Sequence, residues 1–306
     1  MTLRHVVAVS QFDRPAVESL FALADEMRTL ARPSNRQAGK ILATLFYEPS
    51  TRTRLSFESA MHRLGGAVIS TENAREFSSA IKGETVEDTV RMASGYADAI
   101  VLRHHEQGAA ARAAAVSPVP ILNAGDGPGE HPTQALLDLY TIRHELGRID
   151  DLTLVLMGDL RFGRTARSLA LLARLSVNPR LIFVNPPETP MGDDIRDALS
   201  AAGVPFREEP SLERALPEAD VVYQTRVQKE RFASEAVYVA AKGSYILNRT
   251  AYDLLKPDAV VMHPLPRVDE IGTDVDDDPR SAYFRQAHNG VYVRMALLDM
   301  LLGERG

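Results

Sequence analysis

The segment Ser50-Thr51-Arg52-Thr53-Arg54 brings together side chains that bind phosphate. It supplies three hydroxyl groups and two guanidinium groups, and it follows an apolar run that ends at Tyr47. A helix that begins here would add free backbone N–H groups and the positive end of its dipole. The alternative is a surface helix with Ser50 as its N-cap and exposed arginines, which an isolated Ser-Thr-Arg would favour. Five such residues behind a buried strand instead indicate an anion site.

Arg103 and His131 follow two further apolar runs and extend this polar group. Arg103 comes directly after residues 99–102, and His131 follows the glycine-rich loop 125–129. The loop alone indicates only a turn, because glycine occurs in turns generally. The neighbours of Arg103, His104 and His105, lack a third ligand at any metal-binding spacing, so no metal site is expected.

Two arginines in the second half of the chain suit a dicarboxylate. Arg164 lies in segment 158–165, which follows an apolar run and opens a predicted helix, and Arg226 follows the run 221–225. Guanidinium groups bind carboxylates through paired hydrogen bonds. Both arginines could equally be surface ion-pair partners. Segment 158–165 lacks the G-x-G-x-x-G spacing of a dinucleotide site, so an NAD-dependent oxidoreductase is a weak alternative.

The segment His263-Pro264-Leu265-Pro266-Arg267 contains two prolines where the last predicted strand ends. Proline has no N–H group, so the chain stops pairing and bends there, which exposes backbone carbonyls. Such carbonyls accept hydrogen bonds from an amide NH₂ group.

Short apolar runs alternate with amphipathic stretches, a pattern typical of parallel sheets covered by helices. Helices are predicted from Pro15 to about residue 32, from Ser50 to about 64, and over 133–146 and 290–302. Strands are predicted at 41–47, 67–70, 99–102, 119–123, 152–157, 181–185, 221–225 and 260–263. Ligands of open α/β sheets bind beyond the carboxyl ends of the strands, where the polar segments lie. We expect an α/β protein of two domains, each a parallel sheet with helices on both faces, with the active site in the cleft between them.

Length and composition restrict the class of protein. A chain of 306 residues suits two domains, and no apolar run is long enough to cross a membrane, so no membrane partner is expected. The net charge of −6 and the dispersed arginines argue against nucleic acid as a partner. The absence of cysteine excludes disulfides and thiolate metal sites and fits a cytoplasmic location.

Together, these segments resemble the carbamoyltransferase family, with matches from Phe46 to near Asn289. The motif Ser50-Thr51-Arg52-Thr53-Arg54 marks the whole family. The segments Arg226-Val227-Gln228-Lys229-Glu230-Arg231 and His263-Pro264-Leu265-Pro266 indicate its aspartate branch, because ornithine enzymes typically carry a cysteine in the corresponding segment. The family pattern also implies a cis bond between Leu265 and Pro266, which proline permits.

The resemblance implies a carbamoyl phosphate-binding domain (1–132 with the C-terminal helix 288–306), an interdomain helix (133–147) and an aspartate-binding domain (148–287). The implied reaction transfers the carbamoyl group of carbamoyl phosphate to the amino group of L-aspartate. It gives N-carbamoyl-L-aspartate and phosphate, belongs to pyrimidine biosynthesis and needs no cofactor.

The resemblance also implies a role for each site residue. Carbamoyl phosphate would contact Ser50, Thr51, Arg52, Thr53, Arg103, His131, Gln134, Pro264, Leu265 and Pro266. Of these, Thr53, Arg103 and His131 would be catalytic because they face the carbonyl oxygen. Aspartate would contact Lys82, Arg164, Arg226 and Gln228, and Glu48 would orient Arg164 and Arg231 from behind.

In the family, the loop corresponding to residues 72–84 enters a neighbouring subunit's site. Ser78 and Lys82 would therefore act in trans in a homotrimer. The local alternative is a surface loop. Regulatory chains and other enzymes of the pyrimidine pathway are further possible partners.

Two other functions stay open at this point. One is carbamoyl transfer to another amine such as ornithine, whose cationic end Arg164 and Arg226 should repel. The other is a non-catalytic subunit that binds carbamoyl phosphate without turnover, although the full set of expected site residues is present. The acidic run 274–278 is expected to be a solvated loop without a function.

Overall fold

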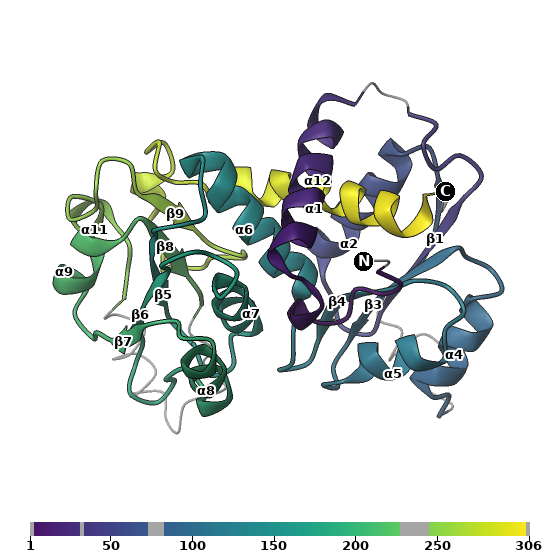
Figure 1. Cartoon of the computed structure of the whole chain (residues 1–306), viewed down its shortest axis with the longest axis horizontal. Coiled ribbons are helices and arrows are strands. Elements are labelled where there is room, and N and C mark those ends of the chain that lie inside the picture. The colour runs from purple at the N-terminus through teal and green to yellow at the C-terminus, as the bar shows by residue number, and fades with distance from the viewer. Residues whose placement is uncertain (1–2, 31–33, 73–82, 227–244, 304–306) are drawn as a thin grey trace. The chain divides into compact units, whose positions relative to one another are not determined.

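The computed structural model describes residues 3–30, 34–72, 83–226 and 245–303 (Figure 1). The chain divides into two compact units: unit 1 is Met1–Leu137 with His288–Gly306, and unit 2 is Asp138–Ala287. The division falls within helix α6 (Pro132–Leu146) and within helix α12 (Tyr283–Leu302). None of the described helices is long and apolar enough to cross a membrane.

The described part of unit 1 holds a four-stranded parallel sheet. Its strand order is β2 (Ala67–Glu72), β1 (Ile41–Phe46), β3 (Ala99–His104) and β4 (Ile121–Asp126). Figure 1 shows α4 (Val86–Ala93) and α5 (Ala109–Val116) on one side of these strands, with α1 (Arg14–Thr29) and the end of α12 on the other. Helix α2 (Thr51–Arg63) follows β1. Because both faces are covered, β1, β3 and β4 are almost continuously buried.

The described part of unit 2 holds a five-stranded parallel sheet. Its order is β7 (Phe206–Glu208), β6 (Arg180–Val184), β5 (Thr153–Met157), β8 (Val221–Gln224) and β9 (Val260–Met262). Helices α7 (Arg164–Ala173) and α8 (Asp193–Ala201) lie on one side, and α9 (Leu212–Ala215) and α11 (Arg249–Tyr252) on the other (Figure 1). Short 3-10 helices occupy Val9–Gln11, Leu216–Glu218 and Thr273–Val275. The predicted α/β class, with helices on both faces of each parallel sheet, is confirmed.

Sequence signals account for several helix ends. Asp13 caps α1 by accepting the N–H of Ala16, and the helix ends at Thr29, slightly before the predicted residue 32. Helix α6 ends at Leu146, as predicted, and is followed by Gly147, whose φ of +72° suits glycine. Helix α12 begins at Tyr283, earlier than the predicted residue 290, because its first turns are also buried.

The last part of α12 packs on other elements of unit 1. Arg28 of α1 donates to Asn289 Oδ1 at 2.7 Å, and Arg294 donates to Ser56 Oγ of α2 at 2.7 Å. The Arg294 guanidinium also lies over the ring of Phe57, 5.0 Å from its centre. These contacts fix the C-terminal helix beside the helix that carries the Ser50 to Arg54 motif.

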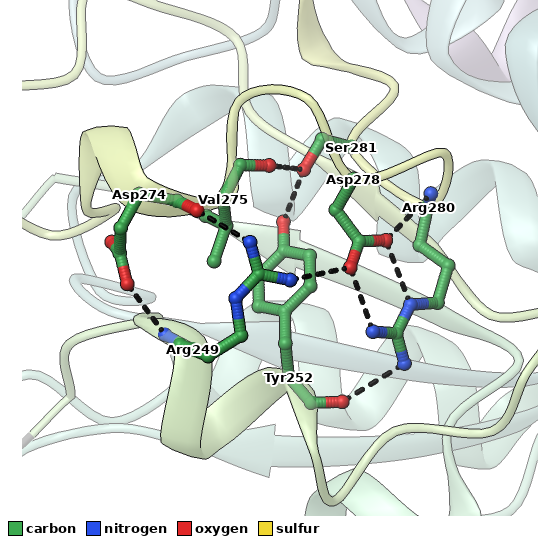
Figure 2. Close-up of polar contacts among 7 residues, drawn as sticks. All are labelled: Arg249, Tyr252, Asp274, Val275, Asp278, Arg280 and Ser281. Carbon is green, nitrogen blue, oxygen red and sulfur yellow. Dashed lines mark hydrogen bonds and ion pairs between the residues drawn. The ribbon is translucent and has the colours of Figure 1, made fainter.

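The acidic run 274–278 is only partly the solvated loop that the sequence predicts, because Asp274 and Asp277 are exposed but Asp278 is largely shielded. The Asp278 carboxylate, 7% exposed, accepts hydrogen bonds from Arg280 at 2.8 and 2.9 Å and from Arg249 at 3.1 Å (Figure 2). Asp274 accepts the backbone N–H of Arg249 at 2.9 Å. Hydrogen bonding to Arg280 holds the pKa of Asp278 at about 2. The sequence prediction therefore misses the arginine partners of Asp278, which lie in other segments or follow a proline.

Candidate active site

The three strands of unit 1 that precede the polar segments are neighbours in the sheet. Strand β3 lies between β1 and β4, with Phe46 opposite Arg103 and His104 opposite Asp126. All three strands are parallel, so the loops that follow them leave from one edge. The fold therefore brings the Ser50 segment, Arg103 and His131 to the same edge, as the sequence predicted.

The start of α2 leaves hydrogen-bond donors available. Ser50 occupies the N-cap position, as expected, but its side chain makes no capping hydrogen bond. The next residues differ in exposure, because Thr51 and Arg52 are exposed and Thr53 is buried. The first N–H groups of the helix, with these hydroxyls, form a surface that suits an anion.

Arg52 and Arg54 differ sharply in their surroundings. The Arg52 guanidinium makes no hydrogen bond or ion pair with the part of the chain that the structure describes. Neighbouring atoms desolvate it and lower its pKa from the ordinary value, although an arginine remains protonated at neutral pH. Arg54 instead pairs with Glu72 at 2.9 Å and donates to Ser70 at 3.4 Å. Arg52 is thus placed to bind a ligand, whereas Arg54 holds β2 against α2.

Arg103 is held in place by two acceptors. Its Nη1 donates to the backbone oxygen of Ala124 at 3.1 Å, and its Nη2 lies 3.6 Å from Glu48 Oε2. Glu48 thus supports Arg103, a contact that the sequence does not predict. Its predicted action on Arg164 and Arg231 stays a prediction.

Asp126 organises the loop that leads to His131. Its carboxylate is 7% exposed. It accepts the N–H of Gly108 at 2.8 Å through Oδ2, and the N–H of Glu130 at 2.9 Å and Nδ2 of Asn123 at 3.2 Å through Oδ1. From the sequence, this loop is predicted only to be a turn. The available signal was a carboxylate at the end of an apolar strand.

His131 and Gln134 are both buried at the start of α6. The side-chain oxygen of Thr133 lies 3.4 Å from Nδ1 of His131. A buried imidazole that carries a proton on one nitrogen can donate a hydrogen bond to a developing oxyanion. The geometry therefore allows the predicted role of His131.

His104 has a structural environment. Burial lowers its pKa, and the adjacent His105 lowers it further, so the ring is neutral at pH 7. Its Nδ1 accepts the N–H of Glu106 at 3.1 Å, and its ring stacks on His105 with centres 4.3 Å apart. Within the described ranges, no group of three or more His, Asp or Glu side chains could hold a metal ion.

Arg164 and Arg226 of unit 2 also follow strands that are neighbours in their sheet. Strands β5 and β8 pair with Met157 opposite Gln224, so segments 158–163 and 225–226 leave the same edge. The two segments touch, because a Cβ added at Gly158 would lie 2.2 Å from the backbone oxygen of Thr225. Arg164 is the first residue of α7, and Arg226 is exposed just after β8. The edge thus carries two guanidinium groups from adjacent loops.

Strand β9 lies beside β8, so segment 263–267 leaves that edge too. The peptide bond between Leu265 and Pro266 is cis, as expected, and Leu265 has a φ of +55°. Arg267 pairs with Asp276 and donates to the Tyr283 hydroxyl at 3.0 Å. These contacts tie the far end of the segment to the body of unit 2.

Four predicted site residues lie outside the described residues: Ser78, Lys82, Gln228 and Arg231. Their roles stay predictions.

Comparisons with known proteins agree along the whole chain. A family model described as aspartate/ornithine carbamoyltransferase, carbamoyl-P binding domain, matches residues 4–144, and the Asp/Orn binding domain of the same family matches 150–301. The chloroplastic aspartate carbamoyltransferase of Oryza sativa subsp. japonica is 56% identical over 99% of this chain and 86% of its own.

Two solved structures show the same similarity. The catalytic subunit of M. jannaschii aspartate transcarbamoylase has a TM-score of 0.92 and 47% identity, covering 98% of both chains. Aspartate transcarbamoylase from Trypanosoma cruzi in complex with carbamoyl phosphate and aspartate has a TM-score of 0.91 and 39% identity, covering 97% of this chain and 95% of that one.

Proposed function

Since the chain belongs to the aspartate/ornithine carbamoyltransferase family, we propose that it transfers the carbamoyl group of carbamoyl phosphate to L-aspartate. The products are N-carbamoyl-L-aspartate and phosphate, and the reaction serves pyrimidine biosynthesis. The observation that carries the proposal is the 56% identity with an aspartate carbamoyltransferase over 99% of this chain. The residues at the two sheet edges supply the chemistry that this reaction needs.

Unit 1 binds the phosphate of carbamoyl phosphate. Ser50, Thr51 and Thr53 donate hydrogen bonds, together with the first N–H groups of α2, and Arg52 and Arg103 neutralise the charge. The Arg52 guanidinium is only partly desolvated and makes no hydrogen bond within the described residues, so an anion would supply its missing partner.

Thr53, Arg103 and His131 stabilise the oxyanion that forms during transfer. These residues lie at the ends of neighbouring strands, or in the segments that follow them, at one edge of the unit 1 sheet. Glu48 and the Ala124 carbonyl hold Arg103 before substrate binds, so little reorganisation is needed during the reaction. Loss of one such donor typically costs ~10²–10³ in rate.

Gln134 and the carbonyls of Pro264 and Leu265 bind the carbamoyl NH₂ group, and Pro266 completes the loop. A carbonyl oxygen accepts from an NH₂ group and has no favourable contact with a methyl group in its place. This set therefore orients the carbamoyl plane and selects an amide.

Unit 2 binds aspartate. Arg164 and Arg226 pair with its carboxylates, Lys82 and Gln228 add contacts, and Glu48 orients Arg164 and Arg231. The two guanidinium groups on adjacent loops favour a dicarboxylate over the cationic side chain of ornithine. The acceptor choice thus follows from charge.

The reaction proceeds by attack of the uncharged amine of aspartate on the carbamoyl carbon. A C–N bond forms, and the carbonyl oxygen takes negative charge opposite Thr53, Arg103 and His131. The C–O bond to phosphate then breaks as the carbonyl re-forms, and the amine's proton leaves with the phosphate. Holding both anions in position supplies much of the acceleration.

The assembly is proposed from the family resemblance. The chain forms a homotrimer in which Ser78 and Lys82 act in the neighbouring subunit's site, and it works in the cytoplasm. Association with regulatory chains or other pyrimidine-pathway enzymes is a further part of the proposal. Mixing inactive Arg52→Ala chains with inactive Lys82→Ala chains tests the shared site, since hybrid trimers that stay inactive would rule it out.

The function is tested by measuring both products from the purified chain supplied with carbamoyl phosphate and L-aspartate. Phosphate and N-carbamoyl-L-aspartate should appear in equal amounts. Phosphate release without carbamoyl aspartate would mean hydrolysis and would contradict the proposal.

A further inference from the structure

The segment that follows β9 rests on a buried pair of titratable side chains. The side chains of His263 and Glu270 are 1% and 6% exposed, and His263 Nε2 lies 2.8 Å from Glu270 Oε1. We propose that His263 and Glu270 are positioning residues that fix the Pro264 and Leu265 carbonyls for recognition of the substrate's NH₂ group. This inference rests on the proposed function, because it concerns the same site.

The hydrogen bonds of His263 determine which tautomer it adopts. The backbone N–H of Leu265 donates to Nδ1 of His263 at 2.8 Å. A backbone N–H is only a donor, so Nδ1 must carry a lone pair and no proton. In the neutral ring the proton therefore sits on Nε2, which donates it to Glu270. The ring links the carboxylate to the backbone of the recognition segment.

Glu270 must be ionised for this arrangement. Its Oε1 accepts from His263, and its Oε2 accepts the N–H groups of Val268 at 3.1 Å and Asp269 at 3.2 Å. All three partners are donors, so neither oxygen can carry a proton without losing a hydrogen bond. Burial alone would raise the pKa of Glu270, but the hydrogen bond from His263 and those from the backbone hold it at about 2.

A second chain of buried groups fixes the backbone at His263. Its N–H donates to Gln286 Oε1 at 2.9 Å, and Gln286 Nε2 donates to Asp138 Oδ1 at 2.7 Å. The Tyr223 hydroxyl donates to the other oxygen of Asp138 at 2.7 Å. The segment is thus held at the N–H of His263 and at the N–H of Leu265, on either side of Pro264.

The conformation of Leu265 explains why such support is needed. Its φ of +55° is unfavourable for a residue with a Cβ, so the surroundings must hold it. The N–H of Leu265 is the group that His263 holds. A loss of this hydrogen bond would free the adjacent peptide units to rotate and would misdirect the two carbonyls.

Acetyl phosphate isolates this contact, because it carries a methyl group where carbamoyl phosphate carries NH₂. Inorganic phosphate isolates the phosphate site of unit 1. Dissociation constants for the three ligands, measured by calorimetry on the full chain, separate the NH₂ contact from phosphate binding. The parent protein should bind carbamoyl phosphate more tightly than acetyl phosphate.

Two substitutions at His263 separate its two hydrogen bonds. His263→Asn retains an oxygen near Nδ1 for the Leu265 N–H, whereas His263→Gln retains a polar atom near Nε2 only. In His263→Gln the preference for carbamoyl phosphate should fall ~10-fold, as expected for one lost hydrogen bond, with phosphate binding unchanged. His263→Asn should keep most of the preference. His288→Gln, at an exposed position, is the matched control.

The tautomer gives a direct test on the parent protein. Nitrogen NMR of the ¹⁵N-histidine-labelled parent, with His263 assigned from His263→Asn, should show a proton on Nε2 and none on Nδ1. A proton on Nδ1 would overturn the proposal. An unchanged ligand preference in folded His263→Gln, or an equal loss of affinity for all three ligands, would also overturn it. A parent protein that binds no carbamoyl phosphate would instead refute the proposed function.

Discussion

Replacing Asp126 by Asn tests whether this carboxylate holds the loop that leads to His131. Asp126 is 7% exposed and uses both oxygens as acceptors. Oδ2 accepts from Gly108, and Oδ1 accepts from Glu130 and Asn123. An asparagine has one oxygen, so its NH₂ group must face at least one N–H donor. The substitution therefore removes a hydrogen bond and places the new NH₂ group against a buried N–H donor. It barely changes the side-chain volume.

The expected loss is that of one unsatisfied buried group, about 2 kcal/mol of the free energy of unfolding. For a unit of this size, that lowers the Tm by roughly 4–8 °C in differential scanning calorimetry. Activity should fall further than stability suggests, because a displacement of about 1 Å at His131 can cost ~10²-fold in rate. We expect kcat/KM to fall by roughly 10- to 100-fold at a temperature where the variant is fully folded.

Asp258→Asn provides the control, since it makes the same chemical change at an exposed position. Its Tm and kcat/KM should match those of the parent. If Asp126→Asn also left the Tm within about 1 °C and kcat/KM within about twofold, the reasoning would be refuted.

Three further predictions follow from the same structure. His131→Ala should lower kcat by roughly 10²-fold, and a kcat within about twofold of the parent would refute its role at the oxyanion. Arg52→Gln should weaken phosphate binding at least ~10-fold in a calorimetric titration. Arg54→Gln, which loses structural ion pairs, should mainly lower the Tm, and the reverse pattern would contradict the assignment. The pKa of Asp278 is lowered from 3.8 to about 2, so its carboxylate contributes stability above pH ~4 that is lost as the pH falls toward 2. This contribution is about 2 kcal/mol, so Asp278→Asn should flatten the pH dependence of the Tm in that range, and an unchanged acid profile would contradict it.

Features that depend on neighbouring residues in the sequence were predictable. The inner strands are buried on both faces, so β1, β3 and β5 appear as apolar runs. The motif at Ser50 was recognisable because its residues are consecutive. Helix α5 was not predicted, since its sequence AAARAAAV is too uniform in side-chain type to show helical periodicity.

Features that depend on distant partners were not predictable. Gly108 and Asp126 are 18 residues apart, and Asp138 and Gln286 are 148 apart. A single sequence does not show which distant donor a carboxylate will meet. Asp138 offered one signal, because it is an acid among apolar residues of α6, but the signal did not identify Gln286 or Tyr223 as its partners.

The most direct test of the proposed function compares acceptors. Initial rates are measured with carbamoyl phosphate and either L-aspartate or L-ornithine, across a range of acceptor concentrations. We predict that aspartate is carbamoylated with a kcat/KM at least ~10³-fold above that of ornithine, because Arg164 and Arg226 favour a dicarboxylate and repel a cation. Faster transfer to ornithine would contradict the assignment of these arginines. Binding of carbamoyl phosphate without transfer to either amine would contradict an enzymatic function.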